Sequence, residues 1–406
     1  MDSLTKDLKK YIKENWNTCV RENKIGTETL IGMPYPYIIP APKYYWEEMY
    51  YWDTYFTSQG LYLTGEEALA KSCTENMLYL VDRYGYMPNG NRTYYLNRSQ
   101  PPFLSMMVMD VYKRYRDKEF LERAYETLKK EYNFWMTQRI TPIGLNKFSV
   151  NKENLGDTEH ISKYFSKRIG YTIPNCDSKT MAVKLLTDCE SGWDFNPRCE
   201  FKQDETVHID LNCNLYLYEK NFAFMSRELN LKEEDKWEKR ADARKELMNR
   251  YLWDGSAFMD YNFNEDKTMK LFSAASFFAL WAGVASSQQA EETRRQLKRI
   301  EREYGIAATE EYSLPGIYQW AYPNGWPPLQ YVVIKGLDNY GFKEDARRVA
   351  QKYVSIMETL FEKTGTLWEK YNVLTGNKDA VGDYGERIML GWSAGVYLFA
   401  KDYLES

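Results

Sequence analysis

The sequence predicts an all-α fold in which helical hairpins form a ring, with the long loops gathered at one end. Apolar residues recur at spacings of three and four along most of the 406-residue chain, which is the period of amphipathic helices. Short turns such as Thr64-Gly65 and Arg116-Asp117 join helices in pairs, and longer connections separate the pairs. Strand-like alternation is confined to the stretch near Phe258–Phe263.

The predicted helices follow one another closely along the chain. We expect them near residues 3–15, 52–63, 66–83, 102–116, 118–138, 205–229, 231–252, 270–285, 288–303, 327–340, 343–363 and 388–403. In the helix at 118–138, Leu121 and Leu128 lie on the apolar face. Thr64 and Glu67 have the spacing of a capping box, which predicts that the helix at 66–83 begins there.

Two helix entries, at 98–104 and 324–330, resemble each other. Each contains two consecutive prolines. Proline suits the first turn of a helix because its missing N–H would be unpaired there anyway. The likeness hints at internal repetition, as in a ring of similar hairpins.

The long connections contain many of the residues that bind or transform ligands. They are expected at 31–51, 84–101, 139–204, 304–326 and 364–383, and they are rich in Trp, Tyr, Asn, Asp and Glu. Loops carry function when a rigid scaffold positions them. We therefore expect one cleft lined by these segments.

The composition limits the chemistry of that cleft. The chain has 35 Tyr, 12 Trp and 18 Phe but only 2 His, His160 and His208. Metal sites with several histidines are therefore excluded, and histidine-based catalysis would depend on one of two residues. Tyr and Trp stack on flat ligands and present a polar tip. This composition favours a site of aromatic, carboxylate and amide groups.

Charge and hydropathy bear on partners and location. The net charge of -4 gives no electrostatic reason to expect nucleic acid or an anionic membrane as a partner. No apolar run approaches the ~18 residues of a membrane span. The N-terminal stretch MDSLTKDLKKYIKENW is charged and lacks the apolar region of a signal peptide. We therefore expect a cytoplasmic protein with reduced thiols and a small-molecule partner.

Carboxylates and aromatics occur together in four loop segments, at 48–53, 190–195, 368–372 and 383–386. Glycoside hydrolysis needs two carboxyl groups across the scissile bond, one protonated and one ionised. Asp194 lies between two aromatic residues, where partial desolvation favours the protonated form. Any one carboxylate is more often a helix cap, and any one Trp more often core. Four such segments together favour a glycosidase.

Several blocks of the sequence resemble the trehalases of glycoside hydrolase family 37. The block at Pro88–Val108, PNGNRTYYLNRSQPPFLSMMV, and ESGWDFNPR at Glu190–Arg198 carry the resemblance most specifically. QWAYPNGWPPLQ at Gln319–Gln330, EKYN at Glu369–Asn372 and GDYGERIMLGWSAGV at Gly382–Val396 are similar to further motifs of that family, in the same order. Together the blocks cover most of residues 42–400.

The resemblance implies an (α/α)6 barrel that hydrolyses an α-glucosidic bond with inversion, most simply that of trehalose. It implies a single domain over residues 1–406, of which 1–40 are an N-terminal helix and lead-in. Asp194 would be the general acid and Glu369 the general base that activates water, roughly 6.5–9.5 Å apart as in other inverting pairs. No metal or organic cofactor is needed, because carboxyl groups and water suffice for the proton transfers.

The resemblance also implies which residues bind the sugar. By motif match the substrate-binding residues are Trp46, Trp52, Asp53, Asn89, Arg98, Gln100, Glu159, Trp326 and Asp383. Asp383 stands where the family usually has a glutamate.

Three departures from the family pattern concern specificity. Tyr45 stands where the family has an arginine, Asp157 falls at the nearest counterpart of a second arginine, and Ala321 replaces an aspartate. Arginine's planar fork is hard to replace where paired hydroxyls are bound. Arg168 and Arg198 are the candidates to compensate for the two lost arginines.

These departures leave other functions open. The first is hydrolysis of another small α-glucoside, such as glucosylglycerol, glucosylglycerate or a different glucobiose. The second is a non-catalytic sugar-binding protein, which the presence of both Asp194 and Glu369 disfavours. A sugar epimerase on a similar toroid is disfavoured because such chemistry usually relies on histidine bases, and the chain has 2 histidines.

Overall fold

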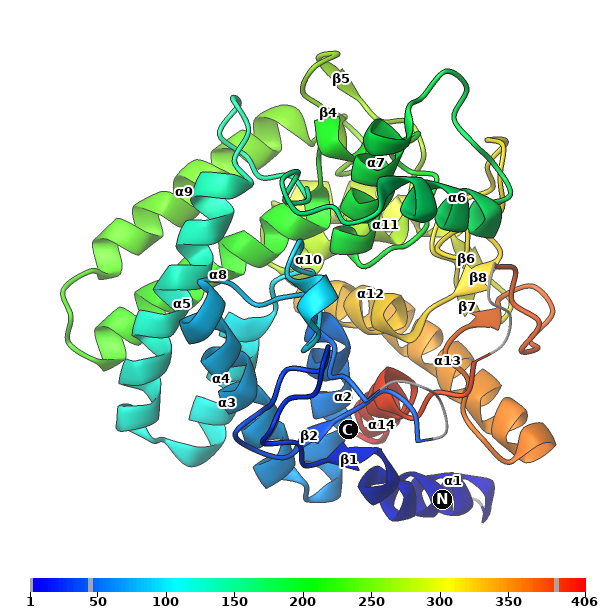
Figure 1. The fold of residues 1–406 in the computed structure, drawn as a ribbon. Helices are drawn as coiled ribbons and strands as arrows, with labels where there is room; N and C mark the ends of the chain where they lie inside the picture. Colours follow the sequence, from blue (N-terminus) through cyan, green and yellow to red (C-terminus); the bar gives the residue numbers. More distant parts are fainter. Residues whose placement is uncertain (1–2, 43–46, 383–386) are drawn as a thin grey trace.

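The computed structural model describes residues 3–42, 47–382 and 387–406 and is built from two concentric rings of helices (Figure 1). The inner ring consists of α2 (Tyr51–Thr64), α4 (Leu104–Tyr115), α8 (Ile209–Glu228), α10 (Phe278–Trp281), α12 (Pro327–Asn339) and α14 (Gly391–Glu405). Neighbouring inner helices pack against one another from α4 through α8, α10, α12 and α14 to α2. A hydrogen bond of 3.2 Å from Gln59 of α2 to Asp110 of α4 joins the ends of this series.

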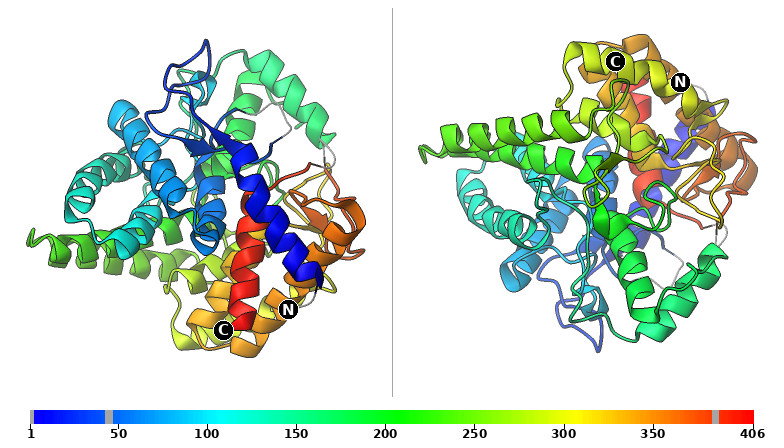
Figure 2. Two further views of the ribbon diagram at one scale, coloured as in Figure 1. Left: turned by 90° about the horizontal axis from the view of Figure 1, so that it is seen from below. Right: turned by 90° about the horizontal axis from the view of Figure 1, so that it is seen from above.

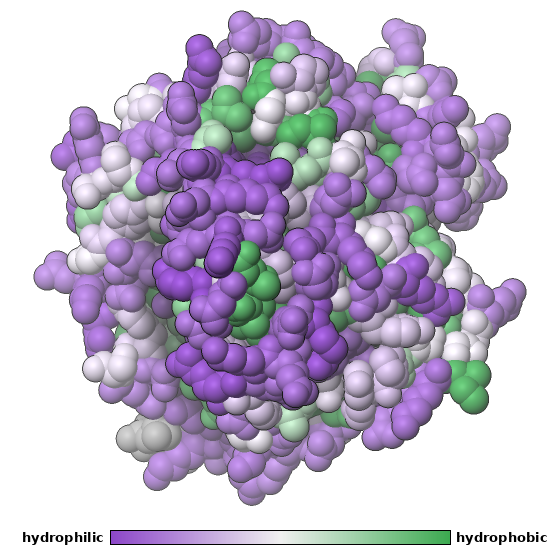
Figure 3. Space-filling model, turned by 90° about the vertical axis from the view of Figure 1, so that its left-hand side faces the viewer, coloured by the Kyte–Doolittle hydropathy of each residue, from purple (hydrophilic) through white to green (hydrophobic). Residues whose placement is uncertain are grey.

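The outer ring covers the inner helices. It consists of α3 (Glu67–Tyr84), α5 (Lys118–Gln138), α9 (Glu234–Tyr251), α11 (Ser287–Arg295) and α13 (Lys343–Thr364), with α1 (Ser3–Asn15) packed on α13. Each of α3, α5, α9, α11 and α13 follows an inner helix in the chain. The predicted (α/α)6 barrel is therefore confirmed. The side of the ring near α9 presents a mostly hydrophilic surface (Figure 3).

Short strands and 3₁₀ turns connect the helices. The antiparallel pairs are β1 (Val20–Arg21) with β2 (Tyr37–Ile38), β6 (Glu301–Arg302) with β7 (Gly305–Ile306), and β8 (Asn324–Gly325) with β9 (Tyr371–Asn372). A three-stranded sheet contains β3 (Thr206–Val207), β4 (Tyr261–Asn262) and β5 (Lys267–Thr268). The 3₁₀ turns are Trp16–Cys19, Thr93–Tyr95, Gln203–Glu205, Ala274–Phe277 and Gln296–Arg299.

The two ends of the described chain lie side by side. Figure 2 shows α1 next to α14 on the lower face of the ring. Lys9 of α1 forms an ion pair of 3.2 Å with Glu405 of α14. This ion pair joins the two ends of the described chain.

The long loop predicted at 139–204 contains a helical hairpin that the sequence analysis missed. It consists of α6 (Thr158–Ile169) and α7 (Ser178–Ser191), which pack on each other. Only Ser166 and Ile169 of α6 are buried, so this helix contributes little to the core. Asp157 and Asp177 cap the two helices through their side chains, so the Asp N-caps were the signal that marked them.

Several local predictions were wrong. The helix expected at 288–303 ends at Arg295, and Glu301–Arg302 form β6. The helix expected at 270–285 contains only a 3₁₀ turn at Ala274–Phe277 and the short α10, because Ser273 is held in a β-bridge to Thr309. The capping box is absent, since the Thr64 hydroxyl donates to the Gly60 carbonyl inside α2 and α3 has no side-chain cap. The helix predicted from residue 102 begins at Leu104, so its prolines precede it, whereas those of α12 occupy its first turn.

A close helix crossing in the inner ring depends on two glycines. A Cβ atom on Gly60 of α2 would lie 2.7 Å from the Cα atom of Gly395 of α14, and one on Gly395 would overlap the Phe56 carbonyl oxygen.

Gly395→Ala is therefore expected to lower the free energy of unfolding by about 1–3 kcal/mol or more, because the backbone must move. Urea unfolding measures it. Asp402→Ala, at an exposed position of the same helix, is the control and should change stability little; equal stability of both variants would contradict this crossing.

Candidate active site

One large cavity opens at the loop end of the barrel, with a volume of about 810 Å³. It brings together eight of the residues that the sequence predicted for the site, which are Trp52, Asp53, Asn89, Arg98, Gln100, Asp194, Trp326 and Glu369. They come from α2, from the segment before α4, from the end of α7 and from the loops around β8 and β9. The single cleft expected from the long loops is thus present.

Other predicted residues are not part of this set. Glu159 lies on α6 outside the cavity, with its side chain 73% exposed and paired with Lys163 at 3.4 Å, so the structure does not bring it to the sugar site. Asp157 caps α6. Trp46 and Asp383, and Tyr45 with them, lie outside the described residues.

Four tryptophans form one wall of the cavity. The rings of Trp320 and Trp326 are parallel with centroids 3.8 Å apart, and Trp52 and Trp392 pack on Trp320 at 5.3 and 6.1 Å. All four line the cavity. Sequence reasoning did not assign Trp320 and Trp392 to the site, although both lie in the quoted motifs. Trp392 falls within the helix predicted at 388–403. Such a wall suits the apolar face of a sugar ring.

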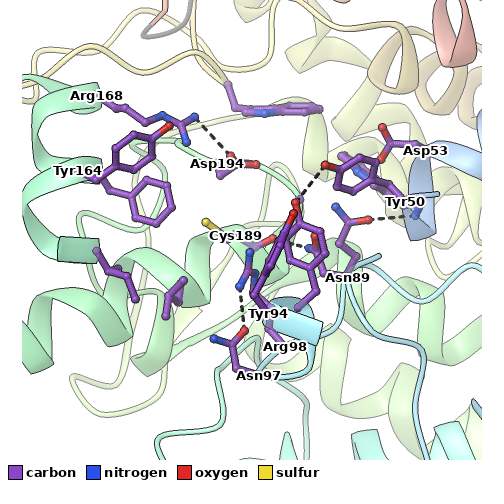
Figure 4. A pocket seen from close by; sticks show the side chains of 18 of the residues that line it. Tyr50, Asp53, Asn89, Tyr94, Asn97, Arg98, Tyr164, Arg168, Cys189 and Asp194 are labelled. Atoms are coloured by element: carbon purple, nitrogen blue, oxygen red, sulfur yellow. Dashed lines mark hydrogen bonds and ion pairs between the residues drawn. The ribbon is translucent and has the colours of Figure 1, made fainter. Parts of the chain in front are cut away.

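The motif Glu190–Asp194 folds as the end of α7 and the turn that follows it. Gly192 takes a φ of +75° and ends the helix, and a Cβ atom there would lie 2.8 Å from the Trp52 ring. The Ser191 hydroxyl accepts a hydrogen bond of 3.1 Å from the Trp193 N–H. This tight turn points the Asp194 side chain into the cavity, where it is 33% exposed (Figure 4).

The Glu190 carboxylate connects this turn to the segment before α4. It is fully buried and accepts hydrogen bonds from the Ser99 N–H at 2.8 Å and the Ser149 N–H at 2.6 Å. Two guanidinium nitrogens of Arg139 donate to it, at 2.9 and 2.8 Å. Ser99 stands between Arg98 and Gln100, so this one carboxylate fixes two cavity-lining residues relative to Asp194.

Arg168 of α6 forms an ion pair with Asp194. Its guanidinium nitrogen lies 3.7 Å from an Asp194 oxygen, as Figure 4 shows. The sequence predicted that partial desolvation favours the protonated form of Asp194, whereas this ion pair favours the ionised form. Arg198, the other arginine considered, is fully buried and paired with Asp210 at 2.7 Å, away from the cavity lining.

Glu369 sits deeper than Asp194. It is 4% exposed, and its carboxylate forms an ion pair of 3.0 Å with the buried Lys370 ammonium. The loop is held by β8 and β9, in which Gly325 pairs with Tyr371, and by a 3.1 Å hydrogen bond from the Trp392 indole to the Glu369 carbonyl. The ion pair matches the ionised carboxylate that a general base requires.

Asp53 is the third carboxyl group in the cavity, on the first turn of α2. Burial raises its pKa to about 8, and the negative charges of Glu369 and Asp194 add to the shift. An acid with this pKa is largely protonated at neutral pH and donates a hydrogen bond. The three carboxyl groups therefore lie close enough to influence one another electrostatically.

Polar donors and acceptors complete the cavity. The Arg98 guanidinium donates to the Asn97 side chain at 2.8 Å and lies over the Tyr95 ring at 5.0 Å. The Asn89 side chain donates to the Ser99 carbonyl at 3.2 Å. Among the described residues, no group of three or more His, Cys, Asp or Glu is arranged to hold a metal ion.

A model of the family described as Trehalase matches residues 1–404. The chain belongs to the trehalase family. It is therefore a glycoside hydrolase by family, as the resemblance implied. The periplasmic trehalase of Xanthomonas campestris pv. campestris (strain B100) is 32% identical over 98% of this chain and 74% of its own length. That of Pseudomonas aeruginosa is 31% identical over 97% of this chain and 76% of its own.

Solved structures agree with the fold. The neutral trehalase of Saccharomyces cerevisiae has a TM-score of 0.78 and 28% identity, over 97% of this chain and 80% of that one. A mannosylglycerate hydrolase of glycoside hydrolase family 63 from Thermus thermophilus has a TM-score of 0.66 over 97% of this chain and 99% of that one. At 17% identity the second match bears on the fold alone.

The cytoplasmic location predicted from the sequence is contradicted by these relatives, several of which are named periplasmic trehalases. The prediction depended on the charge of the first residues, which is a local feature and says nothing about where the folded enzyme works. No helix in the described parts of the chain has the length and apolarity of a bilayer span.

The raised pKa of Asp53 makes a prediction about stability. A carboxyl group whose pKa is about 8 in the folded protein and ordinary in the unfolded chain lowers stability as pH rises from about 4 to about 8. Asp53→Asn removes this dependence, so its stability relative to the wild type should rise over that range by roughly 1 kcal/mol per pH unit. Urea unfolding at three pH values measures the difference. A gap that does not change with pH would show that the folded protein does not raise the pKa of Asp53. Asp7→Asn, at an exposed position of α1, is the control.

Proposed function

We propose that the protein hydrolyses trehalose to glucose with inversion, with Asp194 as general acid and Glu369 as general base. The observation that carries the proposal is that two loops far apart in the chain deliver these carboxylates to one tryptophan-walled cavity. The relatives named as trehalases support trehalose as the substrate. We also propose that residues 1–406 form one domain, with 1–40 as its lead-in.

The charges in the cavity assign a direction to the substrate. The pKa of Asp53 is raised by Glu369 and by Asp194, so Asp53 and Glu369 are neighbours. In Figure 4 Asp194 lies between Asp53 on one side and Arg168 with Tyr164 of α6 on the other. A general acid acts at the bond between the glucosyl unit and the leaving group. The glucosyl unit therefore occupies the side of Asp53, Glu369 and the tryptophans, and the leaving group the α6 side.

The reaction then needs only these two carboxyl groups and water. Protonated Asp194 gives its proton to the glycosidic oxygen as the bond to the glucosyl carbon breaks. Glu369 takes a proton from a water whose oxygen attacks that carbon from the opposite face. Asp194 afterwards regains a proton from solvent, and Glu369 releases one. The glucosyl unit leaves as the β-anomer.

A second candidate substrate follows from the departures from the family pattern, because Asp157 stands at the nearest counterpart of a family arginine and caps α6 instead. Leu155, Ile161 and Phe165 also line this part of the cavity. Hydrolysis of a different small α-glucoside, with glycerol, glycerate or a differently linked glucose as the leaving group, is the alternative. Comparing kcat/KM for these compounds with that for trehalose separates the two. A markedly higher kcat/KM for one of these compounds would identify that compound, rather than trehalose, as the substrate.

Asp194→Asn and Glu369→Gln are each expected to lower kcat for trehalose by about 10²–10⁴-fold, because each removes one proton transfer. Binding of trehalose, measured by calorimetry, should remain detectable in both variants. Glu159→Gln is a matched control, because Glu159 was predicted for the site but lies outside the cavity, and it should retain wild-type kcat. Normal turnover by Asp194→Asn would refute its role as the acid.

A further inference from the structure

The helix α6 forms the leaving-group wall of the cavity. His160, Ile161, Tyr164, Phe165 and Arg168 all line it, and they fall at helical spacings on one side of α6. Asp157, the nearest counterpart of one missing family arginine, stands at the N-terminal end of this same helix. An arginine of α6 that lines the cavity is therefore a candidate to replace it.

Arg168 is well held in this wall. It is on the last turn of α6, where the helix dipole favours a cation. Its guanidinium carbon lies 5.2 Å from the ring centroids of both Phe165 and Phe195, and 5.7 Å from that of Tyr164. The side chain is 16% exposed and lines the cavity.

The pairing of Arg168 with Asp194 conflicts with the role of a general acid. An opposite charge within about 4–6 Å favours the ionised form of a carboxyl group, and the two groups are 3.7 Å apart. Other charged or titratable groups of the described chain that interact with Asp194 or line the same cavity are Tyr50, Asp53, Tyr94, Tyr95, Arg98, His160, Tyr164, Asp188, Cys189, Glu369 and Arg387. The carboxyl groups among them oppose ionisation of Asp194. Arg168, in direct contact with Asp194, favours its ionised form.

We propose that Arg168 binds hydroxyls of the leaving group and thereby couples the occupation of that subsite to protonation of Asp194. This inference rests on the proposed function. Guanidinium groups only donate, and sugar hydroxyl oxygens accept, so a leaving-group sugar on the α6 side competes with Asp194 for the same N–H groups. As Arg168 turns to the sugar, Asp194 takes up a proton from solvent. The acid becomes competent when the leaving group is in place, and the arginine lost elsewhere is replaced on α6.

The test compares two substrates that differ on the leaving-group side. Trehalose presents hydroxyls there and needs the acid, whereas α-glucosyl fluoride presents none and needs little protonation. Arg168→Met should lower kcat/KM for trehalose by roughly 10- to 100-fold and leave that for the fluoride within about threefold. In the same variant the midpoint of the alkaline limb of the kcat/KM profile for trehalose should move up by about one pH unit.

Two further variants separate charge from shape. Arg168→Lys keeps the positive charge but not the planar fork, so the alkaline limb should stay in place while kcat/KM for trehalose still falls. Lys167→Met removes a neighbouring charge on the exposed side of α6 and should match the wild type in both respects.

Results that contradict the role of Arg168 can be told apart from results that contradict the proposed function. Equal losses on both substrates in Arg168→Met would indicate a purely structural role, and an unmoved alkaline limb would show that Arg168 does not control Asp194. Either result overturns this inference while trehalose hydrolysis stands. A wild-type protein that hydrolyses neither substrate overturns the proposed function and this inference together.

Discussion

The buried carboxylate of Glu190 is the contact on which the geometry of the site depends. Its two oxygens accept from the backbone N–H groups of Ser99 and Ser149 and from Arg139. Removing one partner of such a buried ion pair lowers the free energy of unfolding by several kcal/mol, because the other partner is left charged and uncompensated. It joins three segments that are distant in the sequence. The turn that carries Asp194 is thereby fixed to the segment that carries Arg98 and Gln100.

The barrel supplies the rest of the framework. The inner ring places α2 with Trp52 and Asp53 beside α14 with Trp392, through the close crossing at Gly60 and Gly395. Elsewhere around the cavity, β8 and β9 connect the loop of Trp326 to that of Glu369. The two proposed catalytic groups therefore stand on loops whose ends are anchored in helices and short sheets. Such anchoring is what a proton-transfer site requires, since displacements of about 1 Å are costly to catalysis.

The sequence predicted the parts of the fold that have a strong local signal. The helices at 3–15 and 118–138 have the predicted bounds, because their apolar period reflects a face packed on the ring. The helix α6 was missed because only Ser166 and Ile169 are buried in it. Residues 270–285 were predicted as a helix from the spacing of their apolar residues, but contacts with the chain near Thr309 hold the backbone in another form.

Sequence motifs identified residues of the site, but they did not give the positions of these residues in space. Asp194, Glu369 and six binding residues came from the resemblance, and all line the cavity. Glu159 was assigned from a stretch where the sequence departs from the family, and there the alignment of a single glutamate carried no geometric information. The contact of Arg168 with Asp194 depends on how α6 packs on α7, which no local pattern encodes.

The central claim, inversion by a carboxyl pair across one bond, is tested most directly by proton NMR of the first glucose released from trehalose. Attack by water from the face opposite the leaving group converts one unit to β-glucose, while the other leaves with its α-configuration intact. Before mutarotation, the account predicts the two anomers in equal amounts. Release of α-glucose alone would show retention, and would contradict the assignment of Glu369 as a base acting through water.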